Sequence, residues 1–439
     1  MNSKILIVGT VPFNRQTTSR AFDAYFHYIE KDRLAQIFSD SRTPLKGHCG
    51  TLYQITDYMM LKRWLSKKNK VGKIYNYNEL NENVNEENVE NKDDASTLKQ
   101  IAYKFGRMHI PLTHILRKIL WKKRYWCTKE LNDWLDDFKP DCVFLSFSDD
   151  YFIPKIAMYV AKKYNIPIIS SIGDDYYFNK HFSFSLLYNI YKDSYRSLIR
   201  KVFEIPGSAI YISDKIRDKY NKEFNLDGET VYLTSDIKRK AFKEINEINP
   251  VITYFGNIRM GRNLSLNDIG NTLGKISDKY KLEIYSTEKD KRYFKIFTNN
   301  KNIEYKGAVG YEVVMKRMLE SDITIIVEGF RKKDIELSRY SLSTKAADAL
   351  ASGCQILAYG SSECGIIEYM KSTNAAFVCD SKKELEEVIK QMIHDKKIQQ
   401  GYYENQIKMT NEHHNLKISC ATFENVVEKV VRRTKNVKR

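Results

Sequence analysis

Short, mostly apolar runs recur along the chain and alternate with longer segments in which apolar residues repeat at helical spacing. Runs of the first kind are typical of strands that are buried on both faces of a parallel sheet. Strands that alternate with helices in this way indicate an α/β protein. The predicted strands lie at 5–8, 140–146, 166–170, 209–213, 251–256, 282–285, 303–307, 322–327 and 355–359, and the predicted helices at 16–30, 151–164, 311–319, 382–395 and 416–431.

The segment that joins the last two of these strands carries the clearest local signal. Ser341, Ser343 and Thr344 place hydroxyl groups just before a run of good helix formers, where a side-chain oxygen can cap the first turn. Gly353 then ends the helix, because glycine adopts the left-handed conformation without a Cβ clash. Free amide groups and the positive end of the helix dipole, next to Lys345, favour the binding of a phosphate.

The length of 439 residues favours two domains over one. A polar segment at 234–250, which ends in Pro250, is a suitable linker between them. We therefore predict an N-terminal domain at 1–235 and a C-terminal domain at 250–410.

No apolar run approaches the ~20 residues that a membrane-spanning helix needs. The segment Lys4–Pro12 is too short and too weakly basic for a signal peptide, so we interpret it as a first core strand and expect a cytoplasmic protein. The seven cysteines show no Cys-x-x-Cys spacing, and the adjacent His413 and His414 are a weak signal for a metal. We predict neither a disulfide framework nor a metal site.

The formal net charge of +17 favours anionic partners, which include nucleic acid, an acidic membrane surface and phosphate-bearing substrates. Two basic amphipathic stretches, at 101–135 and 186–203, mix lysine and arginine with aromatic residues. Such stretches suit an anionic membrane surface, or else they are helices that cover a sheet and expose a basic face to water. The acidic, asparagine-rich stretch at 79–94 is predicted to be an exposed, mobile loop.

The 343–357 segment resembles the donor-site loop and helix of nucleotide-sugar glycosyltransferases with the GT-B fold, and is similar to the family 4 pattern Pro-Ser-Lys-x-x-Glu-Tyr-x-Ala-x-Gly-x-Pro-Ile-Leu. The sequence departs from this pattern at four positions. Ser343 and Gln355 replace the two prolines, Ala349 replaces the aromatic residue, and Asp348 replaces the glutamate. The matching residues are Thr344, Lys345, Ala351, Gly353, Ile356 and Leu357.

The loop that begins at Gly256 resembles the Gly-Arg-x-x-x-x-Lys loop of the same enzymes, whose basic residues meet the donor diphosphate. Arg262 stands at the lysine position, and Arg259 can supply the charge that the family's arginine would bring. An ordinary exposed turn is the alternative for this loop. The first glutamate of the family's Glu-x7-Glu signature falls on Tyr340, so either Glu328 or Glu336 replaces it, or the sugar is held differently.

The resemblance implies two Rossmann-like domains with parallel sheets that face an interdomain cleft, with the helix at 416–431 packing back onto the N-terminal domain. The C-terminal domain is expected to bind the nucleotide sugar. Asp348 is expected to bind the ribose hydroxyls, and Glu328 to act as a catalytic carboxylate. The expected donor-binding residues are Gly256, Arg259, Arg262, Ser343, Thr344, Lys345 and Asp348. Because arginine and lysine supply fixed positive charge, neither a metal nor a cofactor is expected.

The acceptor is expected to bind the N-terminal domain near Thr10 and Asp174. Asp174 and Asp175 follow a predicted strand, where a carboxylate can act as a base or bind sugar hydroxyls. Asp174 is the predicted catalytic residue, and Asp175 is placed on the acceptor side. The alternative for Asp175 is that it only caps the turn that follows.

The function that the resemblance implies is transfer of a sugar from a nucleotide-diphosphate sugar to a cell-surface glycan or a lipid-linked acceptor, with retention of configuration and at the inner face of the cell membrane. Two alternatives share the fold: an epimerase that acts on the nucleotide sugar alone, and a non-catalytic partner subunit, which would account for the missing glutamate. A nucleic-acid-binding protein would account for the charge, but the sequence contains no recognised module of that kind, and we expect no nucleic-acid partner.

Overall fold

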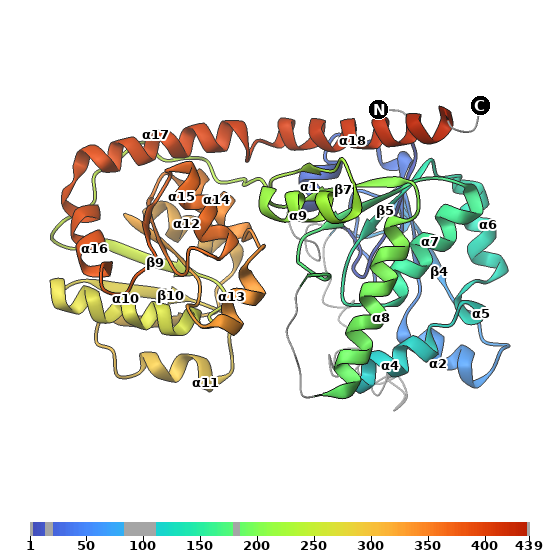
Figure 1. The fold of residues 1–439 in the computed structure, drawn as a ribbon, viewed down its shortest axis with the longest axis horizontal. Coiled ribbons are helices and arrows are strands. Elements are labelled where there is room, and N and C mark those ends of the chain that lie inside the picture. The colour runs from blue at the N-terminus through green and yellow to red at the C-terminus, as the bar shows by residue number, and fades with distance from the viewer. Residues whose placement is uncertain (1–2, 14–20, 83–110, 179–184, 437–439) are drawn as a thin grey trace. The chain divides into compact units, whose positions relative to one another are not determined.

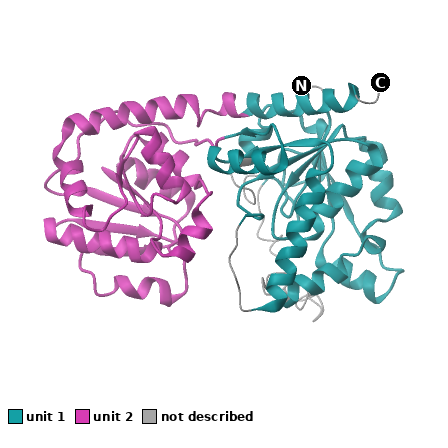
Figure 2. Cartoon of the chain, viewed as in Figure 1, with its two compact units in different colours: residues 1–231, 420–439 teal, residues 232–419 magenta. Residues whose placement is uncertain are grey.

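A computed structural model describes residues 3–13, 21–82, 111–178 and 185–436 of the chain (Figure 1). These residues form two compact units (Figure 2). Unit 1 comprises Met1–Val231 and Cys420–Arg439, and unit 2 comprises Tyr232–Ser419. The segment at 234–250, predicted to be a linker, contains neither helix nor strand and is part of unit 2.

Unit 1 is built on a sheet in which the described residues form eight strands in the order β4-β3-β2-β1-β5-β6-β7-β8. All neighbours are parallel except β3 and β4. The predicted strands β1, β5, β6 and β7 are present, with β6 and β7 displaced by two residues. The strands are β1 Ile5–Val8, β2 Leu34–Phe38, β3 Thr51–Gln54, β4 Lys73–Asn76, β5 Cys142–Ser146, β6 Ile168–Ile172, β7 Gly207–Tyr211 and β8 Glu229–Thr230.

The helices of unit 1 follow the strands and cover the sheet. They are α1 Ala21–Phe26, α2 Asp57–Leu65, α4 Pro111–Leu120, α5 Lys123–Trp126, α6 Lys129–Phe138, α7 Phe152–Tyr164, α8 Leu186–Phe203 and α9 Asp214–Phe224. The helix predicted at 16–30 ends early, since residues 27–30 are not helical, and its start lies outside the described residues. The loop predicted at 79–94 also lies outside them from residue 83 onward.

The basic stretch at 101–135 is not one helix. Its first ten residues lie outside the described part of the chain, and the rest is divided among α4, α5 and α6. Arg117 holds α4 against the unit, because its guanidinium is paired with both Asp57 and Asp150 and only 10% of its side chain is exposed. The indole of Trp121 adds a hydrogen bond of 2.6 Å to Asp57.

Unit 2 contains a parallel sheet whose strands over the described residues run in the order β11-β10-β9-β12-β13-β14. The five predicted strands of this unit are all present. The strands at 251–255, 323–327 and 355–359 are buried almost throughout, as their apolar runs predict, whereas those at 281–285 and 303–307 alternate buried and more exposed residues. The strands are β9 Val251–Phe255, β10 Lys281–Tyr285, β11 Ile303–Gly307, β12 Ile323–Val327, β13 Gln355–Tyr359 and β14 Phe377–Cys379.

The helices of unit 2 alternate with these strands. They are α10 Arg262–Ile276, α11 Lys291–Phe294, α12 Tyr311–Glu320, α13 Lys332–Ser338, α14 Thr344–Ser352, α15 Gly365–Thr373, α16 Leu385–His394 and α17 Lys396–Glu412. The segment at 234–250 is fastened to this unit. Its residue Arg239 donates to the carbonyl of Leu350 at 2.5 Å, and Ile245 is buried in the core cluster of the sheet.

The last helix, α18 Leu416–Asn436, begins in unit 2 and continues into unit 1 (Figure 2). In unit 1 its residue Phe423 is fully buried, and its ring lies 5.2 Å from that of Phe26, 5.5 Å from that of Tyr25 and 5.7 Å from that of Phe144. Aromatic pairs at such separations add to the stabilisation from buried area. None of the helices within the described residues is both long and apolar enough to cross a membrane.

Candidate functional site

The strand order of unit 2 creates a switch point at its centre. The chain runs from β9 outward to β10 and β11, then returns to the other side of β9 and continues through β12, β13 and β14. At such a point the loops after two neighbouring strands leave in opposite directions, and ligands bind in the crevice beyond the carboxyl ends. β9 and β12 pair through Ile252–Ile323 and Thr253–Thr324. The loops that follow them begin at Gly256 and Glu328.

A buried ion pair joins these two loops. Arg262, the first residue of α10, donates from Nη2 to Glu328 at 2.7 Å and from Nε at 3.1 Å. The side chains of Arg262 and Glu328 are 13% and 3% exposed. Burial opposes the charge on the guanidinium, but the bonded carboxylate outweighs it and the pKa of Arg262 is raised. Ser265, one turn along α10, donates to the backbone carbonyl of Glu328 at 2.7 Å.

Lys345 reaches the same place from the start of α14. A Cβ atom built on Gly256 would lie 1.6 Å from Nζ of Lys345, so only a glycine leaves room for the ammonium group. Gly256 also has φ +141°, a conformation that L side chains rarely adopt. Beneath the ammonium lies the ring of Tyr254, with Nζ 5.2 Å from its centroid.

The electrostatics of Lys345 follow from this placement. Burial of the ammonium and the nearby charge of Arg262 lower the pKa of Lys345 to about 7, while Glu328 acts in the opposite direction. The described part of the chain gives Nζ no hydrogen-bond acceptor. Lys345 is therefore a cation that is poorly compensated by the protein and is suited to an added anion.

The helix that carries Lys345 has the predicted ends. Ser343 is the N-cap of α14, and its Oγ accepts a hydrogen bond of 3.3 Å from the amide of Lys345. Gly353 ends the helix with φ +81°. The structure confirms the capping hydroxyl and the glycine stop, and it leaves the side chain of Thr344 exposed.

Two of the predicted donor-binding residues have other partners. Arg259 forms an ion pair with Glu288, with Nη2 to carboxylate oxygen 3.0 Å, and its guanidinium lies 5.0 Å from the ring of Tyr293. This pairing lowers the pKa of Glu288 to about 2. Asp348 is 5% exposed and accepts a hydrogen bond of 2.6 Å from Ser235, a residue of the segment before β9. Arg259 meets Arg262 through its backbone, since its carbonyl accepts from the amide of Arg262 at 3.3 Å, while its guanidinium is paired with Glu288.

The predicted acceptor-side residues belong to unit 1. Thr10 lies in the loop after β1, where its carbonyl accepts from the amides of Ser39 and Asp40 at 3.0 and 2.7 Å. Asp174, in the loop after β6, is exposed. Asp175 caps the turn that follows it, which was the alternative to an acceptor-side role.

One carboxylate oxygen of Asp175 accepts from the amides of Tyr177 and Phe178 at 3.0 and 2.8 Å and from the hydroxyl of Tyr220 at 3.1 Å. Its other oxygen is buried and has no hydrogen-bond partner among the described residues. Burial raises the pKa of Asp175, and the bonds from Phe178 and Tyr177 oppose this shift. Asp175 therefore holds the turn that follows Asp174.

Tyr254 and Asp334 also lie at this site, although no pattern in the sequence indicated them. Asp334 is 3% exposed, pairs with Arg331 at 2.5 Å, and leaves no space for a Cβ on Gly261, the residue before α10. The three glycines of the two loops, Gly256, Gly261 and Gly329, were the available signal, because close approach of backbone and side chain requires them.

No protein-family profile and no curated protein matches this sequence. Solved structures do match. Sucrose-phosphate synthase from Thermosynechococcus elongatus superposes with a TM-score of 0.61 at 8% identity, over 98% of this chain and 100% of that chain. HepE from Anabaena, in complex with UDP-glucose, gives 0.55 at 12% identity over 98% and 100%. WaaG, a glycosyltransferase involved in lipopolysaccharide biosynthesis, gives 0.53 at 10% identity over 96% and 99%.

The chain has the GT-B fold. The predicted fold class, with two mostly parallel sheets, is confirmed. A further GT-B structure, TarM, matches with a TM-score of 0.50 at 14% identity over 67% of this chain, and the chain spans 57% of the length of TarM. At these identities the likeness establishes the fold alone.

Proposed function

We propose that this GT-B protein transfers a sugar from a nucleotide-diphosphate sugar to an acceptor. The observation that carries the proposal is the meeting of Arg262 and Lys345 at the switch point of unit 2, with Gly256 shaped to admit the ammonium. Two cations at the amino ends of α14 and α10 match a diphosphate in charge. The complex of the structural neighbour HepE with UDP-glucose supports this choice of ligand.

The ion pair leaves part of Arg262 available. Glu328 accepts from Nε and Nη2, and the described residues provide no acceptor for Nη1. We propose that Nη1 and the Lys345 ammonium bind the diphosphate and stabilise the charge that gathers on it as the sugar bond breaks, which is the usual largest contribution in such a transfer. Both oxygens of Glu328 are engaged, so we assign it the role of positioning Arg262 in place of the catalytic role that the sequence suggested.

Unit 1 supplies the acceptor side in this proposal, and Asp174 is its candidate catalytic residue. Asp174 is exposed at the turn that the carboxylate of Asp175 holds, and this position after β6 is where we propose that a sugar hydroxyl binds. We further propose a glycan or lipid-linked acceptor. We also propose a reaction that needs no metal, because Arg262 and Lys345 supply the positive charge that a metal ion would otherwise bring to the diphosphate. Retention of configuration stays a prediction from the family resemblance.

A thermal-shift screen of the full chain against nucleoside diphosphates and nucleotide sugars tests the proposal, because a ligand that binds only the native state raises the melting temperature. Release of nucleoside diphosphate is then measured with and without candidate acceptors, and with and without EDTA. Acceptor-dependent release supports a transferase. Turnover without acceptor indicates the epimerase alternative, and binding without any turnover indicates a non-catalytic partner.

Binding of UDP-glucose should weaken as the pH rises above 7. With the pKa of Lys345 at about 7, each further pH unit reduces the charged fraction of the free protein, and the dissociation constant should rise by up to about tenfold per unit. The diphosphate binds the protonated form of Lys345, so loss of that proton raises the dissociation constant. Calorimetric titration at pH 6.5, 7.5 and 8.5 measures it.

The Lys345→Met variant is the control, and its weaker binding should vary little over the same range. A wild-type affinity that is constant from pH 6.5 to 8.5 would contradict the assignment of Lys345 to the diphosphate. The same shift affects stability in the opposite direction. The unfolded chain keeps the proton of Lys345 above pH 7, so the free energy of unfolding gains a contribution as the pH rises from about 7 toward the ordinary lysine pKa.

We also propose that unit 1 docks reversibly on an anionic membrane surface. On α4, Leu112, Leu116 and Ile119 are 51%, 41% and 44% exposed and repeat at helical spacing. The start of α8, which packs against α4, exposes further apolar side chains, namely Leu186, Leu187 and Ile190. An apolar face beside lysines suits the boundary between headgroups and acyl chains.

The protein should cosediment with vesicles that contain phosphatidylglycerol and should be released by salt, since each Lys or Arg near such a surface contributes roughly 1 kcal/mol. Replacing Leu116 and Ile119 by serine should reduce binding at every salt concentration. Replacing Lys118, Lys122, Lys123 and Arg124 by serine should reduce it mainly at low salt. Wild-type protein that stays in the supernatant at low ionic strength would show that these are solvated faces and would favour a soluble acceptor.

A further inference from the structure

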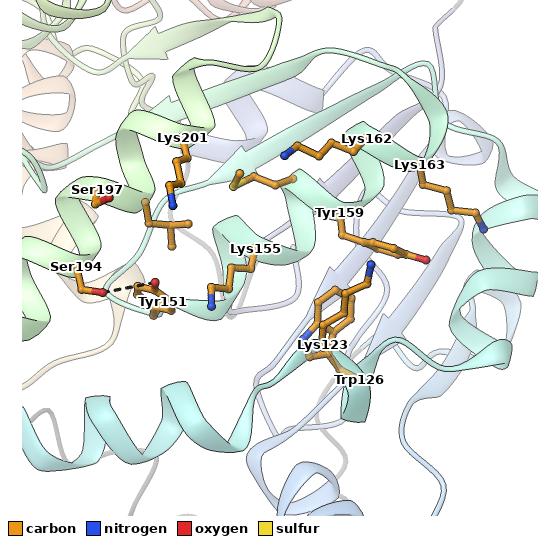
Figure 3. A pocket seen from close by; sticks show the side chains of 12 residues that line it. Lys123, Trp126, Tyr151, Lys155, Tyr159, Lys162, Lys163, Ser194, Ser197 and Lys201 are labelled. Carbon is orange, nitrogen blue, oxygen red and sulfur yellow. Dashed lines mark hydrogen bonds between the residues drawn. The ribbon is translucent and has the colours of Figure 1, made fainter.

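Unit 1 contains a pocket of about 880 Å³ on its helical layer, among α5, α7 and α8 (Figure 3). Lys155 and Lys162 extend from α7, Lys201 extends from α8 and Lys123 from α5, all around one hollow. The volume lies in the range of small-molecule sites and is far larger than a single phosphate requires. None of the residues assigned so far to donor or acceptor lines this pocket.

The lining is strongly one-sided in charge. Five lysines and no acidic residue are among the described side chains that form it. Lys163, the fifth, pairs with Asp136 at 2.8 Å. The other four have no ion-pair partner in the described part of the chain, so an anion that enters the pocket meets uncompensated positive charge.

Two of these lysines, Lys123 and Lys155, lie against aromatic rings, and so does Lys118 nearby. Lys155 and Lys118 lie on the ring of Tyr151, with Nζ 4.4 and 4.6 Å from its centroid, and Lys123 lies 4.3 Å from that of Tyr159. Burial opposes ionisation of the Tyr151 hydroxyl, yet its hydrogen bond with Ser194 and the two ammonium groups outweigh burial, and the pKa of Tyr151 is lowered. Cations that rest on rings lose less freedom when they bind an anion.

The spacing of the charges selects among anions. Lys155 and Lys162 are seven residues apart on α7, which corresponds to roughly 10 Å along a helix. Lys201 adds a charge from the facing helix. A ligand with one acidic group would engage one end of this array, whereas a chain of acidic sugars presents charges at intervals.

We propose that this pocket binds an acidic oligosaccharide, with its carboxylate, sulfate or phosphate groups on Lys155, Lys162 and Lys201. Such a site would hold an anionic glycan on unit 1, whereas the proposed donor site belongs to unit 2. The inference concerns binding alone and does not depend on the proposed transfer reaction.

The test is calorimetric titration of the full chain with tetragalacturonate, with neutral maltotetraose as the matched uncharged ligand. Wild type should bind the acidic tetramer at one site, with an affinity that falls as salt is added, and should bind the neutral one much more weakly. Lys155→Gln with Lys201→Gln should raise the dissociation constant by about tenfold or more, because two charge-assisted contacts are lost. Lys155→Arg with Lys201→Arg should retain most of the affinity.

The control is Lys67→Gln with Lys68→Gln, which removes the same charge from exposed positions of unit 1 that do not line the pocket. An equal loss in this control would show attraction to the overall field of the protein and overturn the site. So would equal affinity for maltotetraose. Displacement of the tetramer by phosphatidylglycerol vesicles, together with loss of vesicle binding in the glutamine variant, would assign the pocket to lipid headgroups and overturn the oligosaccharide.

Discussion

Arg262→Ala should lower the free energy of unfolding of unit 2 by about 3–5 kcal/mol, because it leaves the carboxylate of Glu328, only 3% exposed, buried without its partner. It should also abolish measurable binding of nucleotide sugar. The resemblance to the glycosyltransferase loop implied only a contact between Arg262 and the donor diphosphate. The structure places it at the start of α10 in a two-pronged ion pair, so the expected effect on stability is large.

Urea unfolding followed by tryptophan fluorescence and circular dichroism measures the loss, and the two units must be resolved as separate transitions. The paired variant Arg262→Met with Glu328→Leu is the control. It removes both charges together, and a buried pair replaced by apolar side chains of similar volume is often as stable as the original. We expect it to recover most of the stability and none of the donor binding. Arg262→Ala that unfolds at the wild-type urea concentration would refute a stabilising role for the pair.

Much of unit 2 could be predicted from local pattern. The strands β9, β12 and β13 are continuous apolar runs, which parallel sheets bury on both faces, whereas β10 and β11 alternate buried and more exposed residues. The ends of α14 were also predictable, since Ser343 caps and Gly353 stops the helix through contacts within a few residues. Local contacts of this kind leave a signature in adjacent letters of the sequence.

The site was less predictable because its contacts join distant residues. Glu328 lies 66 positions from Arg262, and nothing in either loop indicates that they pair. The resemblance to the glycosyltransferase loop identified Arg262 and Lys345 as candidates, but it gave the same weight to Arg259, which pairs with Glu288 in the structure. The spacing of a motif indicates which residues lie near the crevice. It does not indicate which of them are paired with a carboxylate from another part of the chain.

In unit 1 the basic stretch at 186–203 coincides with α8, whereas the stretch at 101–135 does not coincide with one helix. The helical spacing of apolar residues after residue 111 suggested a continuous basic segment, whereas the chain turns twice within it. The turns bring Trp121 and Trp126 into the core, where both are nearly fully buried. Burial of two large rings outweighs the few hydrogen bonds that a straight helix would have kept.

Lys345→Met should weaken the binding of nucleotide sugar by roughly 1.5–3 kcal/mol, or about ten- to 150-fold in the dissociation constant, since it removes a charge-assisted contact to the diphosphate. Its stability should equal or exceed that of wild type at pH 7. The ammonium is buried and its pKa is lowered, so folding at this pH gains nothing from the charge that methionine lacks. This is the opposite of the result expected for Arg262→Ala, and the contrast separates the two cations.

Calorimetry with UDP-glucose at pH 7, together with urea unfolding of the same preparations, measures both quantities. Lys332→Met is the matched control, because Lys332 is exposed on α13 of the same unit and the same substitution there should change neither affinity nor stability. Gly256→Ala should reproduce the loss of affinity by a different route, since its added Cβ would displace the ammonium. If Lys345→Met binds UDP-glucose as tightly as wild type while wild type itself binds, the diphosphate lies elsewhere on the chain, and the switch point of unit 2 is not the donor site.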